Sequence, residues 1–336
     1  MKKLDKIDRK LLYLLDRNSR SPLSTLSRKT SLTKEALHYR LRNLKEHGFI
    51  SKFYTIINPA KFGFYFFKIY LQLQNTTEEI EHKLIDYLQA HSRYGWSCFC
   101  SGRWDMIIGI WAEDPIDFES FFLSEFLEHF GDYILAKEVS TTKYNIQQNR
   151  HWLAPHDLVN DELIPSVIGG KTEQAKLDET DHEILRIIAN NARMPITKIA
   201  TLAKTTQTVV THRIRNLERE GIILAYRINF DLENYGYVFC KAFIYLKNTD
   251  QKRIKQFVEY CKENKNIRSI STTFGRWDAE LEFEVPNFEY FHGSMREMKH
   301  KFGDLIKSYD TVLISHEYKA DFMPASYPPF EGYHSK

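Results

Sequence analysis

The sequence lacks the features that mark secreted, membrane-spanning or disulfide-stapled proteins. Of 336 residues 4 are cysteine, which is too few for a disulfide scaffold. No run of about 18 apolar residues provides a membrane span. The first residues, MKKLDKIDRKLL, interleave acids with bases and do not resemble a signal peptide. These absences predict a cytoplasmic protein.

The common catalytic and metal-binding motifs are absent as well. The 13 histidines form no HExxH motif, and neither a Gly-x-x-x-x-Gly-Lys loop nor a Gly-x-Ser-x-Gly elbow occurs. Cys98 and Cys100 are separated by a single residue on a predicted strand, which is not the CxxC spacing of a zinc site. The sequence therefore predicts no catalytic residue, no metal and no cofactor.

The charge of the chain is unevenly distributed. Hydrophobic residues make up 43% and charged residues 27%, as in ordinary globular proteins, and the net charge is only +3. Residues 1–58, however, hold 14 Lys/Arg against 5 Asp/Glu, a net of +9, whereas residues 174–231 hold 9 against 7, a net of +2. A basic end on a mildly acidic remainder favours an anionic partner.

The chain is an internal repeat in which one constant offset relates the two halves. This offset pairs Arg20 with Arg193, the run 40–44 (RLRNL) with 213–217 (RIRNL), and Gly-Arg-Trp-Asp at 102–105 with the same tetrapeptide at 275–278. The period is too long for a solenoid unit. We interpret the chain as a duplicated two-domain module.

The first part of each copy has the pattern of three helices followed by a β-prone segment. Apolar spacing predicts helices at 5–17, 22–30 and 34–47, and at 178–190, 195–203 and 207–220. Thr33 is a suitable N-cap and Gly48 a suitable terminator for the third helix. The segments after it, 49–57 and 222–230, are candidates for a wing.

The second part of each copy has the order β-α-β-β-α-β, which is ferredoxin-like. Strands are predicted at 67–73, 94–101, 105–112 and 133–144 and at 238–247, 267–274, 278–285 and 306–318, with helices between them. The fold class is α+β. The predicted boundaries are 1–60 and 176–233 for the winged helix-turn-helix domains, 61–145 and 234–320 for the ferredoxin-like domains, 146–175 for a linker and 321–336 for a tail.

The third helix carries the strongest chemical signal. With Leu37, Leu41 and Leu44 facing inward, its outer face presents Lys, His, Tyr and Arg, which suit the base edges of a DNA major groove. A solvated basic face is the structural alternative. The predicted DNA-contacting residues of the first copy are Lys29, Thr33, Lys34, Glu35, His38, Tyr39, Arg40 and Arg42, with Lys29 and Arg40 assigned to phosphates or to packing.

The segment 26–33 (LSRKTSLT), the helix with 40–44 and the end Gly48-Phe49-Ile50 resemble the winged helix-turn-helix of Lrp/AsnC transcriptional regulators. The β-α-β-β-α-β part, with Gly102 and Asp105 between its middle strands, resembles their regulatory (RAM) domain. The resemblance spans about 4–144 and about 177–319. It implies a sequence-specific regulator that binds double-stranded DNA. Single-copy members of the family dimerise, and duplication is the departure here.

The resemblance also implies an amino-acid effector near Gly102 and Asp105, and near Gly275 and Asp278. A carboxylate there could accept hydrogen bonds from an α-ammonium group. The alternative is a structural β-turn, in which glycine supplies a positive φ and aspartate accepts backbone N–H groups. Arg103 beside Trp104, and Arg276 beside Trp277, are candidates for cation–π pairs.

Two other functions stay open. Family members also wrap DNA, so an architectural DNA-binding protein is one alternative. Sirohaem decarboxylases resemble these regulators too and, by that resemblance, carry a His-Asn-Tyr-x-Arg stretch. The corresponding segments here, 96–105 and 269–278, contain no histidine.

The two predicted DNA-binding copies are not equivalent. Lys34, Glu35, His38 and Tyr39 are replaced by Gln207, Thr208, Thr211 and His212, while Arg213 and Arg215 repeat Arg40 and Arg42. These six residues of the second copy complete the predicted DNA-contacting set. The two regulatory domains could pair in cis, or the chain could associate again. We favour a homodimer or a higher homo-oligomer.

Overall fold

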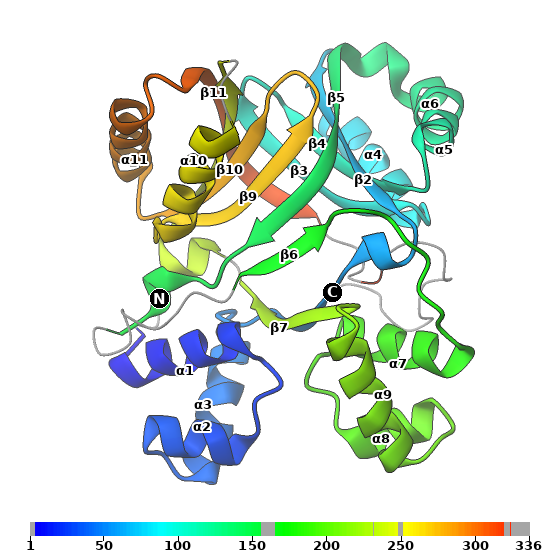
Figure 1. The fold of residues 1–336 in the computed structure, drawn as a ribbon, viewed down its shortest axis with the longest axis vertical. Coiled ribbons are helices and arrows are strands. Elements are labelled where there is room, and N and C mark those ends of the chain that lie inside the picture. The colour runs from blue at the N-terminus through cyan, green and yellow to red at the C-terminus, as the bar shows by residue number, and fades with distance from the viewer. Residues whose placement is uncertain (1–3, 156–164, 231, 248–250, 319–322, 324–336) are drawn as a thin grey trace.

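The computed structural model describes residues 4–155, 165–230, 232–247, 251–318 and 323. Two groups of three helices lie side by side at one end of the molecule, and a β-barrel flanked by helices forms the other end (Figure 1). A ribbon of two strands lies between them. The molecule thus has a helical layer and a barrel layer, each built from both copies of the repeat.

The six helices of the helical layer begin and end within one or two residues of the predicted positions. They are α1 (Lys6–Arg17), α2 (Leu23–Thr30) and α3 (Lys34–Glu46), and α7 (Glu179–Ala189), α8 (Ile196–Leu202) and α9 (Gln207–Arg219). The hydroxyl of Thr33 accepts the Ala36 N–H at 3.2 Å, as expected of an N-cap. Gly48 follows α3 with φ +73°, which a glycine adopts without strain.

The two segments predicted as candidate wings, 49–57 and 222–230, pair with each other. β1 (Lys52–Ile57) and β7 (Ile223–Asn229) form an antiparallel ribbon in which Lys52 lies opposite Asn229 and Thr55 opposite Tyr226. The Thr55 hydroxyl also donates to the carbonyl oxygen of Ile188, at 2.7 Å. The strand after each third helix therefore links the two copies.

One hydrophobic core runs through both three-helix units. Leu11 and Leu37 from the first copy, and Ile184 and Val210 from the second, belong to the same buried cluster. A reciprocal pair of arginines closes the contact. Arg20 donates to the carbonyl oxygen of Ala192 at 2.7 Å, and Arg193, its repeat, donates to that of Ser21 at 3.2 Å. The two units form one packed body.

The predicted β-α-β-β-α-β order is confirmed in both copies. The first consists of β2 (Tyr65–Leu73), α4 (Glu78–Ala90), β3 (Tyr94–Gly102), β4 (Met106–Ala112), the helical stretch α5 (Pro115–Glu119), η2 (Ser120–Phe126) and α6 (Leu127–Phe130), and β5 (Ile134–Gln147). The second consists of β8 (Val238–Leu246), α10 (Gln251–Glu263), β9 (Ile267–Phe274), β10 (Ala279–Val285), α11 (Phe288–Lys301) and β11 (Ile306–Tyr318). Within the described residues of these two units, the segment η2 differs in type, since it is π-helical.

The two ferredoxin-like sheets close into one barrel. The strand order is β2-β4-β3-β11-β8-β10-β9-β5, and β5 also pairs with β2. The junctions between copies are β3 with β11 and β5 with β9, both antiparallel. The regulatory domains thus pair in cis, as one of the two predicted arrangements requires.

The segment predicted as a linker, 146–175, carries secondary structure. β5 extends to Gln147, a short 3-10 helix spans His151–Leu153, and β6 (Ser166–Gly169) pairs with β5. Apolar Leu153 joins the core of the helical layer. The prediction missed the 3-10 helix and β6 because each is only three or four residues long and shows no clear apolar period. Residues 156–164 and the predicted tail, apart from Met323, lie outside the described residues.

Candidate nucleic-acid interface and ligand sites

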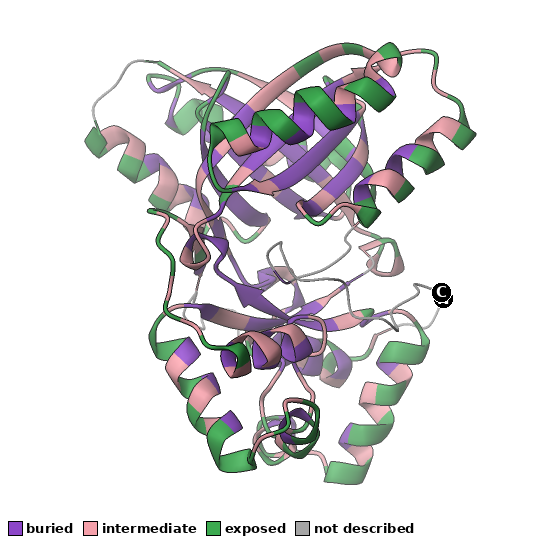
Figure 2. Ribbon diagram, turned by 90° about the vertical axis from the view of Figure 1, so that its right-hand side faces the viewer, coloured by how far each residue is buried: buried purple, intermediate pink, exposed green. Residues whose placement is uncertain are grey.

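The outer face of α3 is exposed at the end of the molecule opposite the barrel (Figures 1 and 2). Tyr39 is 58% exposed, and Arg42 lies within 5.8 Å of its ring centroid. Hydrogen bonds from its own backbone N–H and from Thr33 lower the pKa of the Glu35 carboxyl, so this group stays ionised. The exposed residues among those predicted to contact DNA in this copy are Lys29, Thr33, Lys34, Glu35, His38, Tyr39 and Arg42.

Arg40 does not belong to this exposed face. Its guanidinium donates to the carboxylates of Asp5 and Asp8, each at 2.7 Å. These bonds fasten α3 to the start of α1, which is the packing role that the sequence allowed. Arg213 repeats the arrangement with Asp178 at 2.7 Å and Asp181 at 3.0 Å. We therefore remove Arg40 and Arg213 from the DNA-contacting set.

The corresponding face of α9 is exposed but carries less charge. Gln207, Thr208, His212 and Arg215 are exposed, and Thr211 is half-buried. The Thr211 hydroxyl donates to the Gln207 carbonyl oxygen at 2.8 Å, within its own helix. Both third helices lie at the end of the molecule opposite the barrel (Figure 1), and the outer face of the first is the more basic.

The two Gly-Arg-Trp-Asp segments are the turns β3–β4 and β9–β10. A carboxylate oxygen of Asp105 accepts the Leu73 N–H at 2.8 Å, and one of Asp278 accepts the Leu246 N–H at 2.7 Å. Gly102 has φ +132°, and a Cβ there would lie 2.6 Å from the Thr311 carbonyl oxygen. Gly102, Asp105 and Asp278 thus have the structural β-turn roles that the sequence offered as the alternative to an effector site. Gly275 has no positive φ; a Cβ there would meet Ser140 at 2.8 Å.

The tryptophans of these turns point into the barrel. Trp104 and Trp277 are 3% and 1% exposed, and their ring centroids lie 6.4 Å apart. Arg103 lies over Trp104 at 5.3 Å, as predicted. Arg276 lies instead near Glu138, at 3.6 Å. The two repeated turns therefore meet within one chain.

Sequence reasoning missed a buried charged network inside the barrel. Lys68 and its repeat Lys241 contact the same carboxylate oxygen of Glu280, at 2.7 and 3.3 Å, and the Trp277 indole donates to the other oxygen at 3.1 Å. Burial alone would raise the pKa of Glu280, but the two lysines outweigh it and hold the pKa at about 2. The sequence did contain a signal for this network, because Lys68 and Lys241 each interrupt a mainly apolar strand.

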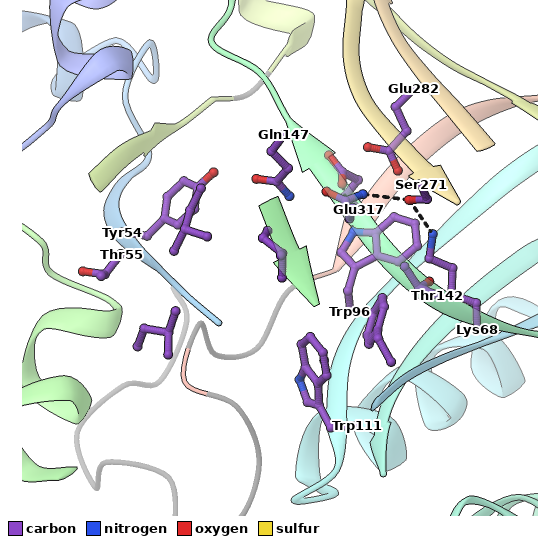
Figure 3. A pocket seen from close by; sticks show the side chains of 16 residues that line it. Tyr54, Thr55, Lys68, Trp96, Trp111, Thr142, Gln147, Ser271, Glu282 and Glu317 are labelled. Atoms are coloured by element: carbon purple, nitrogen blue, oxygen red, sulfur yellow. Dashed lines mark hydrogen bonds between the residues drawn. The ribbon is translucent and has the colours of Figure 1, made fainter. Parts of the chain in front are cut away.

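A cavity of about 180 Å³ opens between the barrel and the β1–β7 ribbon (Figure 3). Tyr54 and Thr55 line it from the ribbon, while Trp96, Trp111 and Lys68 line it from the barrel. No sequence pattern indicated this cavity, because its walls come from both copies of the repeat and from the segment between them.

Three further observations concern the described residues only. They contain no group of three or more His, Cys, Asp or Glu side chains that could hold a metal ion. None of their helices has the length and apolarity needed to cross a membrane. All four cysteines are buried and free.

Comparisons with known proteins match the two halves of the helical layer. Residues 4–45 match the AsnC-type helix-turn-helix domain, and residues 177–223 match a winged helix-turn-helix DNA-binding domain. The HTH-type transcriptional regulator LysM of Saccharolobus solfataricus is 31% identical over 125 residues, which cover 37% of this chain and 85% of that protein. The regulator FL11 of Pyrococcus abyssi is 28% identical over 120 residues, covering 35% of this chain and 77% of that protein.

Among solved structures, the siroheme decarboxylase NirDL has the same architecture over 97% of this chain and 95% of its own, with a TM-score of 0.61. Its sequence identity is only 9%, so this likeness shows the shared fold alone. The family follows from the sequence matches and from the helix-turn-helix units that carry them. The chain belongs to the Lrp/AsnC family of sequence-specific, DNA-binding transcriptional regulators, in which it is a tandem duplication.

Proposed function

We propose that a single chain of this regulator does the DNA reading for which single-copy relatives need a dimer. The observation that carries the proposal is the continuous core of the helical layer, together with the β1–β7 ribbon. Because this core and the ribbon join α3 to α9, the chain presents two third helices in a constant relative orientation. A target with two half-sites at one spacing follows from such an arrangement.

The proposed DNA-contacting residues are those that are exposed on the two third helices. In the first copy they are Lys34, His38 and Arg42 at base edges, with Thr33, Glu35, Tyr39 and Lys29 around them. In the second copy they are Gln207, Thr208, His212 and Arg215, with Thr211 beside them. Because the two sets differ, the two half-sites differ in sequence. A symmetric homodimer would require a palindrome, whereas a fused pair does not.

The experiment is footprinting on a selected site combined with the mass of the complex. We expect a short, discrete footprint whose protection is complete at one chain per site. Changing the half-site spacing by about half a helical turn of DNA places one half-site on the opposite face of the duplex and should abolish protection of one half. Long continuous protection without a defined spacing would instead favour the architectural alternative.

We also propose that a small amino acid binds near Asp105, Asp278 or both, with Gly102 and Gly275 in the same turns. Family membership and the repetition of the turn support this proposal. Asp278 is exposed and Asp105 half-exposed, so both are accessible. Calorimetry with the twenty amino acids tests it in the wild type and in Asp105→Ala and Asp278→Ala. The absence of heat with every amino acid, or unchanged affinity in both variants, would refute it.

The proposal also covers localisation, catalysis and oligomeric state. We propose a cytoplasmic regulator that is not an enzyme and needs no cofactor, in line with the regulators to which it is related. We retain the prediction of a homodimer or a higher homo-oligomer, in which each chain would occupy its own site; pairing of the regulatory domains in cis does not prevent such association.

A further inference from the structure

The cavity between the barrel and the β1–β7 ribbon has aromatic walls. The Phe66 and Trp111 rings lie 4.2 Å apart, and Trp96 and Tyr54 complete the lining. Two glycines make room for this pair: a Cβ on Gly95 would lie 2.8 Å from the Trp111 indole nitrogen, and one on Gly109 would lie 2.2 Å from the Phe66 ring. The positions of the Phe66 and Trp111 rings therefore require glycine at positions 95 and 109.

The polar part of the cavity is rich in acceptors. Asn145 donates its amide to Ser269 and Ser271 at 2.6 and 2.7 Å, and its carbonyl oxygen has no partner among the described residues. The Gln147 carbonyl oxygen and the Thr142 hydroxyl, with Thr142 only 8% exposed, are likewise buried without a hydrogen bond in the described part of the chain. All three side chains come from β5 and line the same cavity. Unmet polar groups of this kind bind a ligand or water.

The charged residues around the cavity are unequal in number. Glu282 and Glu317 line it, and Lys68 is the cationic side chain among the described lining residues (Figure 3). Lys68 is engaged by Glu280 at 2.7 Å, and Glu282 by the buried Lys241 at 3.1 Å, while a carboxylate oxygen of Glu317 accepts the Trp96 indole N–H at 2.9 Å. The two lysines thus balance Glu280 and Glu282. The charge of Glu317 and the acceptors of β5 that lack a hydrogen bond within the described residues favour a ligand that brings positive charge and N–H groups. Aromatic faces attract the same kind of group.

The second copy of the repeat fills the equivalent space with its own side chains. At the offset of the repeat, Tyr54, Gly95 and Trp111 correspond to Arg227, Arg268 and Glu284. There Arg150 binds Glu284 at 2.9 Å and Asp16 at 3.2 Å, and Arg268 lies 3.8 Å from Glu284. One side of the molecule is therefore closed by an internal ion cluster, while the other stays open.

We propose that this cavity binds a small organic amine, with the ammonium group at the acceptors of β5 and an apolar body of about one ring between Trp96 and Trp111. The size agrees, since an apolar cavity of about 150 Å³ holds benzene. The ligand would touch Tyr54 to Ile57 of β1, the strand that follows α3. This site is distinct from the turns of Asp105 and Asp278.

The test uses four probes of similar size on the full chain in the absence of DNA, with calorimetry and tryptophan fluorescence as readouts. The probes are 2-phenylethylamine, 2-phenylethanol, 3-phenylpropionate and L-phenylalanine. We expect the amine to bind at least about tenfold more tightly than the alcohol, since a charge-assisted hydrogen bond replaces a neutral one. The carboxylate should bind most weakly, and the zwitterion L-phenylalanine more weakly than the amine. Equal or tighter binding of 3-phenylpropionate, or no binding of the amine at millimolar concentration, overturns the proposal.

Variants locate the site. Thr142→Val removes the buried hydroxyl at constant volume and should weaken amine binding by about tenfold or more. Gln147→Leu, nearer the end of β5, tests the same acceptors if Thr142→Val does not fold. The matched control is Thr141→Val, whose side chain alternates to the other face of β5 and does not line the cavity. Equal loss in Thr141→Val, or no loss in either cavity variant, overturns the assignment; DNA binding plays no part in these outcomes.

Discussion

The two helix-turn-helix copies share their internal framework and differ on their surface. Arg20 and Arg193 make reciprocal contacts between the copies, and Arg40 and Arg213 make the same pair of ion pairs to the first helix of their own copy. By contrast, the exposed residues Lys34 and Tyr39 become Gln207 and His212. The duplicated copies have kept the arginine contacts that position their helices and have changed the exposed residues of the third helix. The two helix-turn-helix units therefore share a fold and differ in surface chemistry.

In the two ferredoxin-like copies, by contrast, buried residues inside the barrel differ between the copies. Lys68 is repeated as Lys241, but Glu280 has an isoleucine, Ile107, at the matching position. Both lysines therefore share a carboxylate that only the second copy supplies. A homodimer of identical chains would contain two such sites or none. A fused chain is free of this constraint, and the open cavity on one side is a second result of that freedom.

The largest effect is expected from neutralising the shared carboxylate. Glu280→Gln leaves two buried lysines without their common partner, and breaking a buried ion pair costs about 3–5 kcal/mol of unfolding free energy. The matched change in the first copy, Ile107→Val, should cost about 0.5–1.5 kcal/mol. Urea denaturation measures both. Similar costs for the two variants would mean that the network does not stabilise the barrel.

The same group gives a pH dependence with a defined sign. The pKa of Glu280 is about 2 in the folded chain, below its ordinary value. Its stabilisation is therefore fully present above the unfolded pKa of about 4.3 and is lost as the pH falls from there toward 2. Glu280→Gln lacks this component, so the difference in unfolding free energy between wild type and variant should shrink as the pH falls from about 4.3 toward 2.

The next effect concerns the contact between the two helical units. Arg20→Ala and Arg193→Ala each remove hydrogen bonds from a charged donor to carbonyl oxygens of the other copy, which are worth about 1.5–3 kcal/mol. Since the contacts are reciprocal, the two losses in thermal or urea stability should be similar. A large loss in only one variant would show that the interface is not symmetric. Lys198→Ala, at an exposed position of α8, provides a surface control.

Loss of a base-contacting arginine should weaken DNA binding more in α3 than in α9. Arg42→Ala should lower affinity for the best natural site by about 1–3 kcal/mol and relax the sequence preference at one position. Arg215→Ala should cost less, because its helix carries fewer charged neighbours. Titrations of labelled DNA measure both. Equal losses would contradict the asymmetry, and no loss in Arg215→Ala would mean that the second copy only supports the assembly.

The smallest effect is a change in salt dependence. Lys29→Gln removes the exposed lysine that was assigned to a phosphate contact or to packing, and loss of one phosphate contact reduces the slope of log affinity against log salt by about 0.9. Lys34→Gln, at a proposed base edge, introduces the residue that stands at the same place in the second copy and should change the slope less. An unchanged slope in Lys29→Gln would remove Lys29 from the phosphate contacts.

Local sequence patterns predicted most of the helices and strands, and which side of α3 is exposed. The spacing of Leu37, Leu41 and Leu44 defined which side of α3 faces outward, because an α-helix repeats about every 3.6 residues. For Arg40 the sequence left a phosphate contact and a packing role open. Its partners Asp5 and Asp8 lie two helices earlier in the chain, so helical periodicity could not decide between the two roles.

By itself the sequence determined the duplication, the helices and strands, the family and the unequal charge of the two helix-turn-helix units, since each is written in residues close together or at one constant offset. Tertiary structure alone decided that the two copies share a core, that β1 pairs with β7, and that two sheets close into one barrel. It also placed Lys68 and Lys241 on one carboxylate and left a cavity beside Trp111. These features depend on contacts between segments from different copies of the repeat, which are selected by the packing of whole surfaces and leave no periodic signal in the chain.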